Sequence, residues 1–84
     1  NNMNLKEKVI ELILGGSRFD LVDGGLKMDT DLIKDLGYDS LSLIKLLVEI
    51  EETFHFEIED IEILQSSLSV STLIDIVKKH QIDS

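Results

Sequence analysis

Residues 40–54, with the sequence SLSLIKLLVEIEETF, carry the clearest helical pattern in the chain. The segment contains neither glycine nor proline, so nothing in it interrupts a helix. At about 100° per residue, its apolar side chains fall on two sides of the helix. The larger set predicts the face that packs into the core: Leu43, Leu46, Leu47, Ile50 and Phe54. The smaller set, here called the outer stripe, lies more than roughly 90° away and consists of Leu41, Ile44 and Val48.

The outer stripe is more than an amphipathic helix needs, because one apolar stripe suffices to anchor it. Two acids, Glu51 and Glu52, border the stripe, and so does Lys45. We interpret Ile44 and Val48 as a surface for docking partner proteins, with the acids meeting basic partner residues. The alternative is that the long loop before the helix covers the stripe and makes it core. Leu41 stays open between the two interpretations.

Two further main helices flank this one in sequence. Residues 5–14 should form a helix, since Asn4 followed by Glu7 is a capping-box pattern. We expect Gly15-Gly16 to end it through a left-handed backbone. The last helix should start at Ser69 or Ser71, either of which could cap it. The expected buried faces are Leu5, Val9, Leu12 and Ile13 in the first helix, and Val70, Leu73, Ile74 and Val77 in the last.

The rest of the chain connects these helices. Residues 15–39 form a long connection with apolar anchors, an expected helical turn at 31–36 and a bend at Gly24-Gly25. A short helix is expected over residues 60–64. No strand pattern or repeat is present in the sequence. The predicted fold class is therefore all-α, a small four-helix bundle of three main helices and one short helix, with a long loop between the first and second.

Composition narrows the classes of function. The 84 residues suffice for one domain, taken as 1–84 with no weight on Asn1 and Asn2, and we expect a monomer. Seventeen acids against eight bases give a net charge of −9, which disfavours nucleic acid and anionic membranes and favours partners rich in Lys and Arg. No cysteine and no signal-peptide pattern are found, so a cytoplasmic location is expected.

Catalytic and metal-binding patterns are missing from the sequence. The two histidines, His55 and His80, have no triad or metal-ligand spacing with another candidate. A calcium-binding EF-hand loop that began at Asp29 or Asp31 would lack glycine at its sixth position. We therefore expect neither an enzyme nor a metal site.

The segment Asp35-Leu36-Gly37-Tyr38-Asp39-Ser40-Leu41 leads into the central helix and places a serine where that helix begins. The start of a helix leaves backbone N–H groups unpaired and carries partial positive charge. A phosphodiester on Ser40 would be stabilised by both features. Gly37 gives the backbone freedom to turn sharply into the helix. The alternative is a purely structural role, in which Ser40 only caps the helix and Asp39 is a solvated acid.

This segment resembles the attachment motif of acyl carrier proteins, and the resemblance extends from about Met28 to Lys79. It implies that Ser40 is esterified by 4′-phosphopantetheine, which a phosphopantetheinyl transferase takes from coenzyme A. Asp39 and Leu41 flank the serine as that family's motif requires. The resemblance further implies a non-catalytic carrier that visits acyl-loading, condensing and acyl-transfer enzymes with basic docking patches. On this reading residues 1–84 form one acyl-carrier-like domain.

Two positions depart from the carriers of fatty acid synthesis. Ser42 and Lys45 stand where those carriers usually have acids, which leaves room for a polyketide or another specialised pathway. A peptidyl or aminoacyl carrier of a nonribosomal pathway remains an alternative, although Tyr38-Asp39 favours an acyl carrier. An alternative from a different class is an unmodified acidic helical adaptor that binds a basic protein through the same helix.

Overall fold

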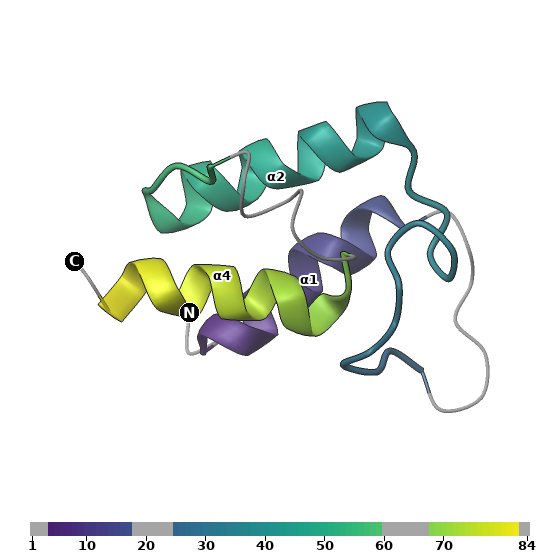
Figure 1. Cartoon of the computed structure of the whole chain (residues 1–84), viewed down its shortest axis with the longest axis horizontal. Helices are drawn as coiled ribbons and strands as arrows, with labels where there is room; N and C mark the ends of the chain where they lie inside the picture. The colour runs from purple at the N-terminus through teal and green to yellow at the C-terminus, as the bar shows by residue number, and fades with distance from the viewer. Residues whose placement is uncertain (1–3, 18–24, 60–67, 83–84) are drawn as a thin grey trace.

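The computed structural model describes residues 4–17, 25–59 and 68–82, and within them the only regular elements are three helices (Figure 1). They are α1 (Leu5–Gly16), α2 (Ser40–Phe54) and α4 (Val70–Ile82). Figure 1 shows α2 along one edge of the molecule, and α1 contacts both α2 and α4. The all-α prediction and its three main helices are confirmed. The short helix expected at 60–64 lies outside the described residues.

The first helix begins as the sequence predicts and ends differently. The Glu7 N–H donates to Asn4 Oδ1 at 2.8 Å, and the Asn4 N–H donates to Glu7 Oε1 at 3.1 Å, which completes the capping box. The predicted left-handed end at Gly15-Gly16 is wrong. Both glycines are helical, and the helix is capped by Ser17, whose φ of −68° and ψ of 137° are those of an extended residue. Among the described glycines, only Gly25 and Gly37 have positive φ.

The other helix ends follow local signals. Ser69, rather than Ser71, caps α4, because its Oγ accepts the Thr72 N–H at 3.2 Å. At the end of α2, His55 adopts the left-handed conformation with φ 61° and donates its N–H to the Glu51 carbonyl at 2.8 Å. This places His55 at a helix end, as the sequence indicates.

Backbone hydrogen bonds join the described part of the long connection to the start of α4. The Leu32 N–H donates to the Leu68 carbonyl at 3.0 Å, and the Val70 N–H donates to the Thr30 carbonyl at 3.1 Å. The helical turn expected at 31–36 is present, since the Asp35 N–H donates to the Asp31 carbonyl at 2.9 Å. These bonds satisfy backbone groups that an unattached loop would have to expose to water. The connection therefore forms part of the fold.

The core is wholly apolar in the part of the chain that is described, apart from one phenol hydroxyl. On α2, Leu46 and Ile50 are buried, while Leu43, Leu47 and Phe54 pack half-buried against the core. This confirms the predicted inner face. The buried residues are Val9, Ile13, Leu32, Leu36, Tyr38, Leu46, Ile50, Leu68, Val70, Leu73, Ile74, Ile76 and Val77.

The two glycines at the end of α1 differ in what surrounds them, and alanine should separate them. A Cβ on Gly16 would lie 2.6 Å from Tyr38 Oη, whereas a Cβ on Gly15 would meet nothing within 4 Å. Tyr38 Oη cannot move aside easily, because it donates to the Ile13 carbonyl at 2.5 Å. We expect Gly16→Ala to lower the free energy of unfolding by about 1–3 kcal/mol.

Gly15→Ala is the matched control, since it adds the same methyl group to the same helix. It should leave the free energy of unfolding unchanged or raise it by up to about 1 kcal/mol, because alanine favours the helix. Urea unfolding of the two variants measures both effects. Equal effects at the two positions would contradict the described packing of Tyr38 against Gly16.

Candidate functional site

Ser40 is the first residue of α2 and is exposed to solvent. Asp39, not Ser40, caps the helix: the Asp39 side chain accepts the Ser42 N–H at 2.9 Å. Within the described residues, the Ser40 hydroxyl takes part in no hydrogen bond. The alternative in which Ser40 serves as the cap is therefore wrong. Its hydroxyl lies at the solvent-exposed N-terminus of α2 and does not stabilise the described part of the fold.

A capping box fixes the backbone around this serine. The Ser42 hydroxyl accepts the Asp39 N–H at 2.9 Å, and the Leu43 N–H donates to the Asp39 carbonyl at 2.9 Å. The N–H groups of Ser40 and Leu41 are left without a partner among the described residues. Two unpaired N–H groups and the positive end of the helix dipole suit a phosphate on the adjacent hydroxyl. The local geometry thus fits a phosphopantetheine ester on Ser40.

The two residues before Asp39 fix the path of the backbone that leads to Ser40. Gly37 has a φ of 79°, which is strained for other residues, so the prediction that glycine permits a sharp turn here is confirmed. Tyr38 is only 2% exposed, and its N–H donates to the Leu32 carbonyl at 3.0 Å. Its hydroxyl reaches α1 at the Ile13 carbonyl. The structural role of Tyr38 was missed at the sequence level, because it depends on a contact across 25 residues.

Burial raises the pKa of Tyr38 to about 12, with a further contribution from the negative charge of Glu49 and an opposing one from the Gly16 backbone. The neutral phenol is the favoured form in the folded chain. Its contribution to stability is therefore complete below pH 10, the usual pKa, and is lost as the pH rises to about 12. The expected loss is about 2–3 kcal/mol at most, from roughly 1.4 kcal/mol per pKa unit.

The titration can be followed directly, because Tyr38 is the only tyrosine and there is no tryptophan. Tyrosinate absorbance of the folded chain should rise near pH 12, and in urea near pH 10. Glu49→Gln removes a charge that raises the pKa, so its transition should begin at lower pH. A native transition close to pH 10 would show that the phenol is not buried as described.

The outer stripe is exposed, as the docking interpretation requires. Leu41 is 80% exposed, Ile44 59% and Val48 42%, so the described part of the preceding loop does not cover them. Glu52 is also exposed. Glu51 has a structural contact that sequence reasoning did not foresee: its Oε2 accepts the Ile58 N–H at 2.8 Å. Ser40 and Leu41 therefore stand together at the start of α2, and Ile44, Val48 and Glu52 follow along it.

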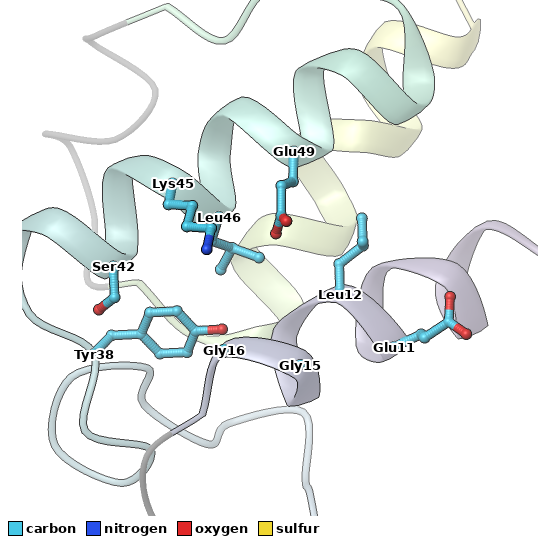
Figure 2. A pocket seen from close by; sticks show the side chains of 9 residues that line it. All are labelled: Glu11, Leu12, Gly15, Gly16, Tyr38, Ser42, Lys45, Leu46 and Glu49. Atoms are coloured by element: carbon cyan, nitrogen blue, oxygen red, sulfur yellow. The ribbon is translucent and has the colours of Figure 1, made fainter.

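A half-open groove of about 360 Å³ lies between α1 and α2. Figure 2 shows Tyr38 on its floor, with Lys45 and Glu49 of α2 above and Glu11 of α1 to one side. Glu49 is nine residues after Ser40 and points about 180° away from it around the helix axis. The groove is thus on the opposite side of α2 from the exposed serine. Sequence periodicity gives no sign of it.

The described ranges 4–17, 25–59 and 68–82 contain neither a metal centre nor a membrane-spanning helix. No group of three or more His, Cys, Asp or Glu side chains there could hold a metal ion. None of the helices found there is long and apolar enough to cross a membrane.

Comparison with known proteins shows which family the chain resembles. The sequence profile of the family described as "Phosphopantetheine attachment site" matches residues 9–77. The acyl carrier protein of Buchnera aphidicola subsp. Baizongia pistaciae is 31% identical over 77 residues, which cover 92% of this chain and 95% of the relative. That of Syntrophus aciditrophicus is 35% identical over 80 residues, 95% of this chain and 96% of the relative. That of Clostridium acetobutylicum is 35% identical over 74 residues, 88% and 92% of the two chains.

Proposed function

The chain belongs to the acyl carrier proteins, the family with a phosphopantetheine attachment site. From this membership we propose that Ser40 bears the phosphopantetheine arm. We also propose that the chain delivers acyl groups between biosynthetic enzymes. Proteins of this family are carriers without catalytic activity of their own. The covalent 4′-phosphopantetheine group is the cofactor that the family implies. When bound, it supplies the thiol that holds the acyl group as a thioester.

One observation supports Ser40 above the other residues. It is an exposed serine at the first position of α2, and its neighbours already satisfy the cap. In the attachment step the Ser40 oxygen forms a bond to the phosphorus next to the pantetheine in coenzyme A. The bond from that phosphorus to the adenosine bisphosphate portion breaks, and the serine proton leaves with a base of the transferase. The unpaired N–H groups of Ser40 and Leu41 stabilise the resulting phosphodiester.

Partner recognition is assigned to the outer stripe with its bordering acids, Glu51 and Glu52. The proposed partners are the phosphopantetheinyl transferase and acyl-loading, condensing and acyl-transfer enzymes with basic docking patches. Contacts must be weak, because one carrier visits several enzymes in turn. The tether compensates, since it raises the local concentration of the acyl group once the carrier is docked.

The proposed pathway is the synthesis of fatty acids, polyketides or related specialised products. The similarity to acyl carrier proteins across most of the chain favours an acyl group over an aminoacyl group. Ser42 and Lys45, where acids are usual in fatty acid synthesis, keep the specialised pathways open. The proposed setting is the cytoplasm, because a chain without cysteine needs no oxidising compartment.

Loading the chain in vitro tests this function. The purified protein is incubated with coenzyme A, magnesium and a promiscuous phosphopantetheinyl transferase, and its intact mass is measured. We expect the mass to rise by one phosphopantetheinyl group. With acetyl coenzyme A as donor, an acetyl group should be added as well, and hydroxylamine should remove the acetyl group alone. A folded chain that gains no mass would instead support the unmodified adaptor.

A further inference from the structure

The exposed face of α2 carries charges of both signs. Lys45 is exposed and forms no ion pair with a described residue. Glu49 follows one turn later, but its carboxylate is not within ion-pair distance of the Lys45 ammonium. A lysine placed four residues before a glutamate is the less favourable order on a helix. The positive charge of Lys45 is therefore available to a partner protein.

Lys45 and Glu52 lie on one line along the helix. They are seven residues apart, which corresponds to about two turns and roughly 10 Å along the axis. Glu52 is exposed and also forms no ion pair with a described residue. By helical position both residues lie beside the outer stripe, with Lys45 nearer to Ser40 and between the stripe and the groove, which it also lines (Figure 2). Along this line the helix presents a cation towards the attachment serine and an anion towards the other end, while the exposed Asp39 before Ser40 and Glu49 beside Lys45 add negative charge outside the line.

Glu51 adds less to this surface than its position in the sequence suggests. One of its carboxylate oxygens accepts the Ile58 N–H, and the residue is half-buried. This hydrogen bond ties the Glu51 carboxylate to the segment after α2 and makes it less accessible to a partner. This leaves Lys45 and Glu52 as the exposed charges of opposite sign that flank the stripe.

We propose that the enzymes served by this carrier present a carboxylate opposite Lys45 and a basic side chain opposite Glu52, on either side of an apolar depression. The inference rests on the proposed function and specifies the partner for the same surface. Opposite charges at the two ends fix the direction in which α2 lies on the enzyme, because the reversed arrangement would bring like charges together. This direction places Ser40 at the carboxylate end of the docking patch. A basic docking patch that includes a carboxylate opposite Lys45 should fit the chain better than a wholly basic one.

A charge-exchange experiment tests this partner chemistry. The probe is a bacterial fatty-acid condensing enzyme with a basic docking patch, together with variants in which each basic patch residue is changed singly to Glu. Binding to the chain is measured by titration calorimetry, with and without the arm. We expect one enzyme variant to bind about two- to tenfold more tightly than the unchanged enzyme. The Lys45→Glu chain should reverse this preference.

Two controls separate local contacts from overall charge. Lys6→Glu on α1 changes the net charge by the same amount and should keep the preference of the unchanged chain. Lys45→Glu combined with Glu52→Lys keeps the net charge and should bind the preferred enzyme variant more weakly. The proposal is overturned if no enzyme variant binds more tightly, or if Lys45→Glu leaves the preference intact. Calorimetry can be done on the chain without the arm. Failed loading would therefore refute the proposed function, and the binding preference could still be measured.

Discussion

Ser40→Ala should abolish loading by the phosphopantetheinyl transferase, so that the intact mass stays unchanged after prolonged incubation with coenzyme A. The physical reason is that the substitution removes the oxygen to which the phosphate is attached. The fold should persist, because Ser40 is exposed and its hydroxyl makes no hydrogen bond within the described part of the chain. Its free energy of unfolding is expected to stay within about 0.5 kcal/mol of the unchanged chain.

Ser42→Ala is the matched control for this prediction. Ser42 is a serine in the same turn, and its hydroxyl exchanges hydrogen bonds with Asp39 in the capping box. The substitution should cost about 1 kcal/mol of stability, because the reciprocal contact is lost, and should leave loading possible. If loading survives in Ser40→Ala and disappears in Ser42→Ala, the arm is attached to Ser42 and the assignment to Ser40 is wrong.

Leu46→Ala should strongly destabilise the fold. Leu46 is 2% exposed and belongs to the buried cluster that joins the three helices. Truncating a buried leucine removes apolar contacts and leaves a cavity, at a cost of about 2–5 kcal/mol. A domain of this size has roughly 4–13 kcal/mol in total, so much of its stability is at stake. Urea unfolding followed by circular dichroism measures the loss.

Leu41→Ala provides the comparison, because it is the same substitution in the same helix at a side chain that is 80% exposed. Its free energy of unfolding should change by less than about 0.5 kcal/mol. Its docking to partner enzymes should weaken, since an apolar contact of the outer stripe is removed. A large loss of stability at Leu41 would place the outer stripe in the core and overturn the docking interpretation.

Local patterns account for most of what the sequence could predict. The capping box at Asn4 and Glu7 involves residues three apart, so no knowledge of the tertiary fold is needed to foresee it. The inner face of α2 follows from helical periodicity, and the structure buries Leu46 and Ile50 accordingly. The exposure of the outer stripe also agrees with the sequence prediction, because a second apolar stripe exceeds what one core contact can cover.

What the sequence predicted wrongly or left undecided involves contacts between distant parts of the chain or competition between neighbouring caps. Gly16 stays helical, and its lack of a side chain makes room for Tyr38, which comes from another segment. Ser40 and Asp39 are both good capping residues, and only the structure shows that Asp39 takes this position. The Ser42 hydroxyl completes a reciprocal cap with Asp39, a role that the sequence prediction did not include.

The most direct test of the account is to locate the added mass within the loaded chain. The chain is treated with coenzyme A and the transferase, digested, and fragmented by tandem mass spectrometry. We predict that the whole phosphopantetheinyl increment resides on Ser40, the exposed first residue of α2. An increment on Ser42 or on any other residue, or a folded chain that carries none, would contradict the account.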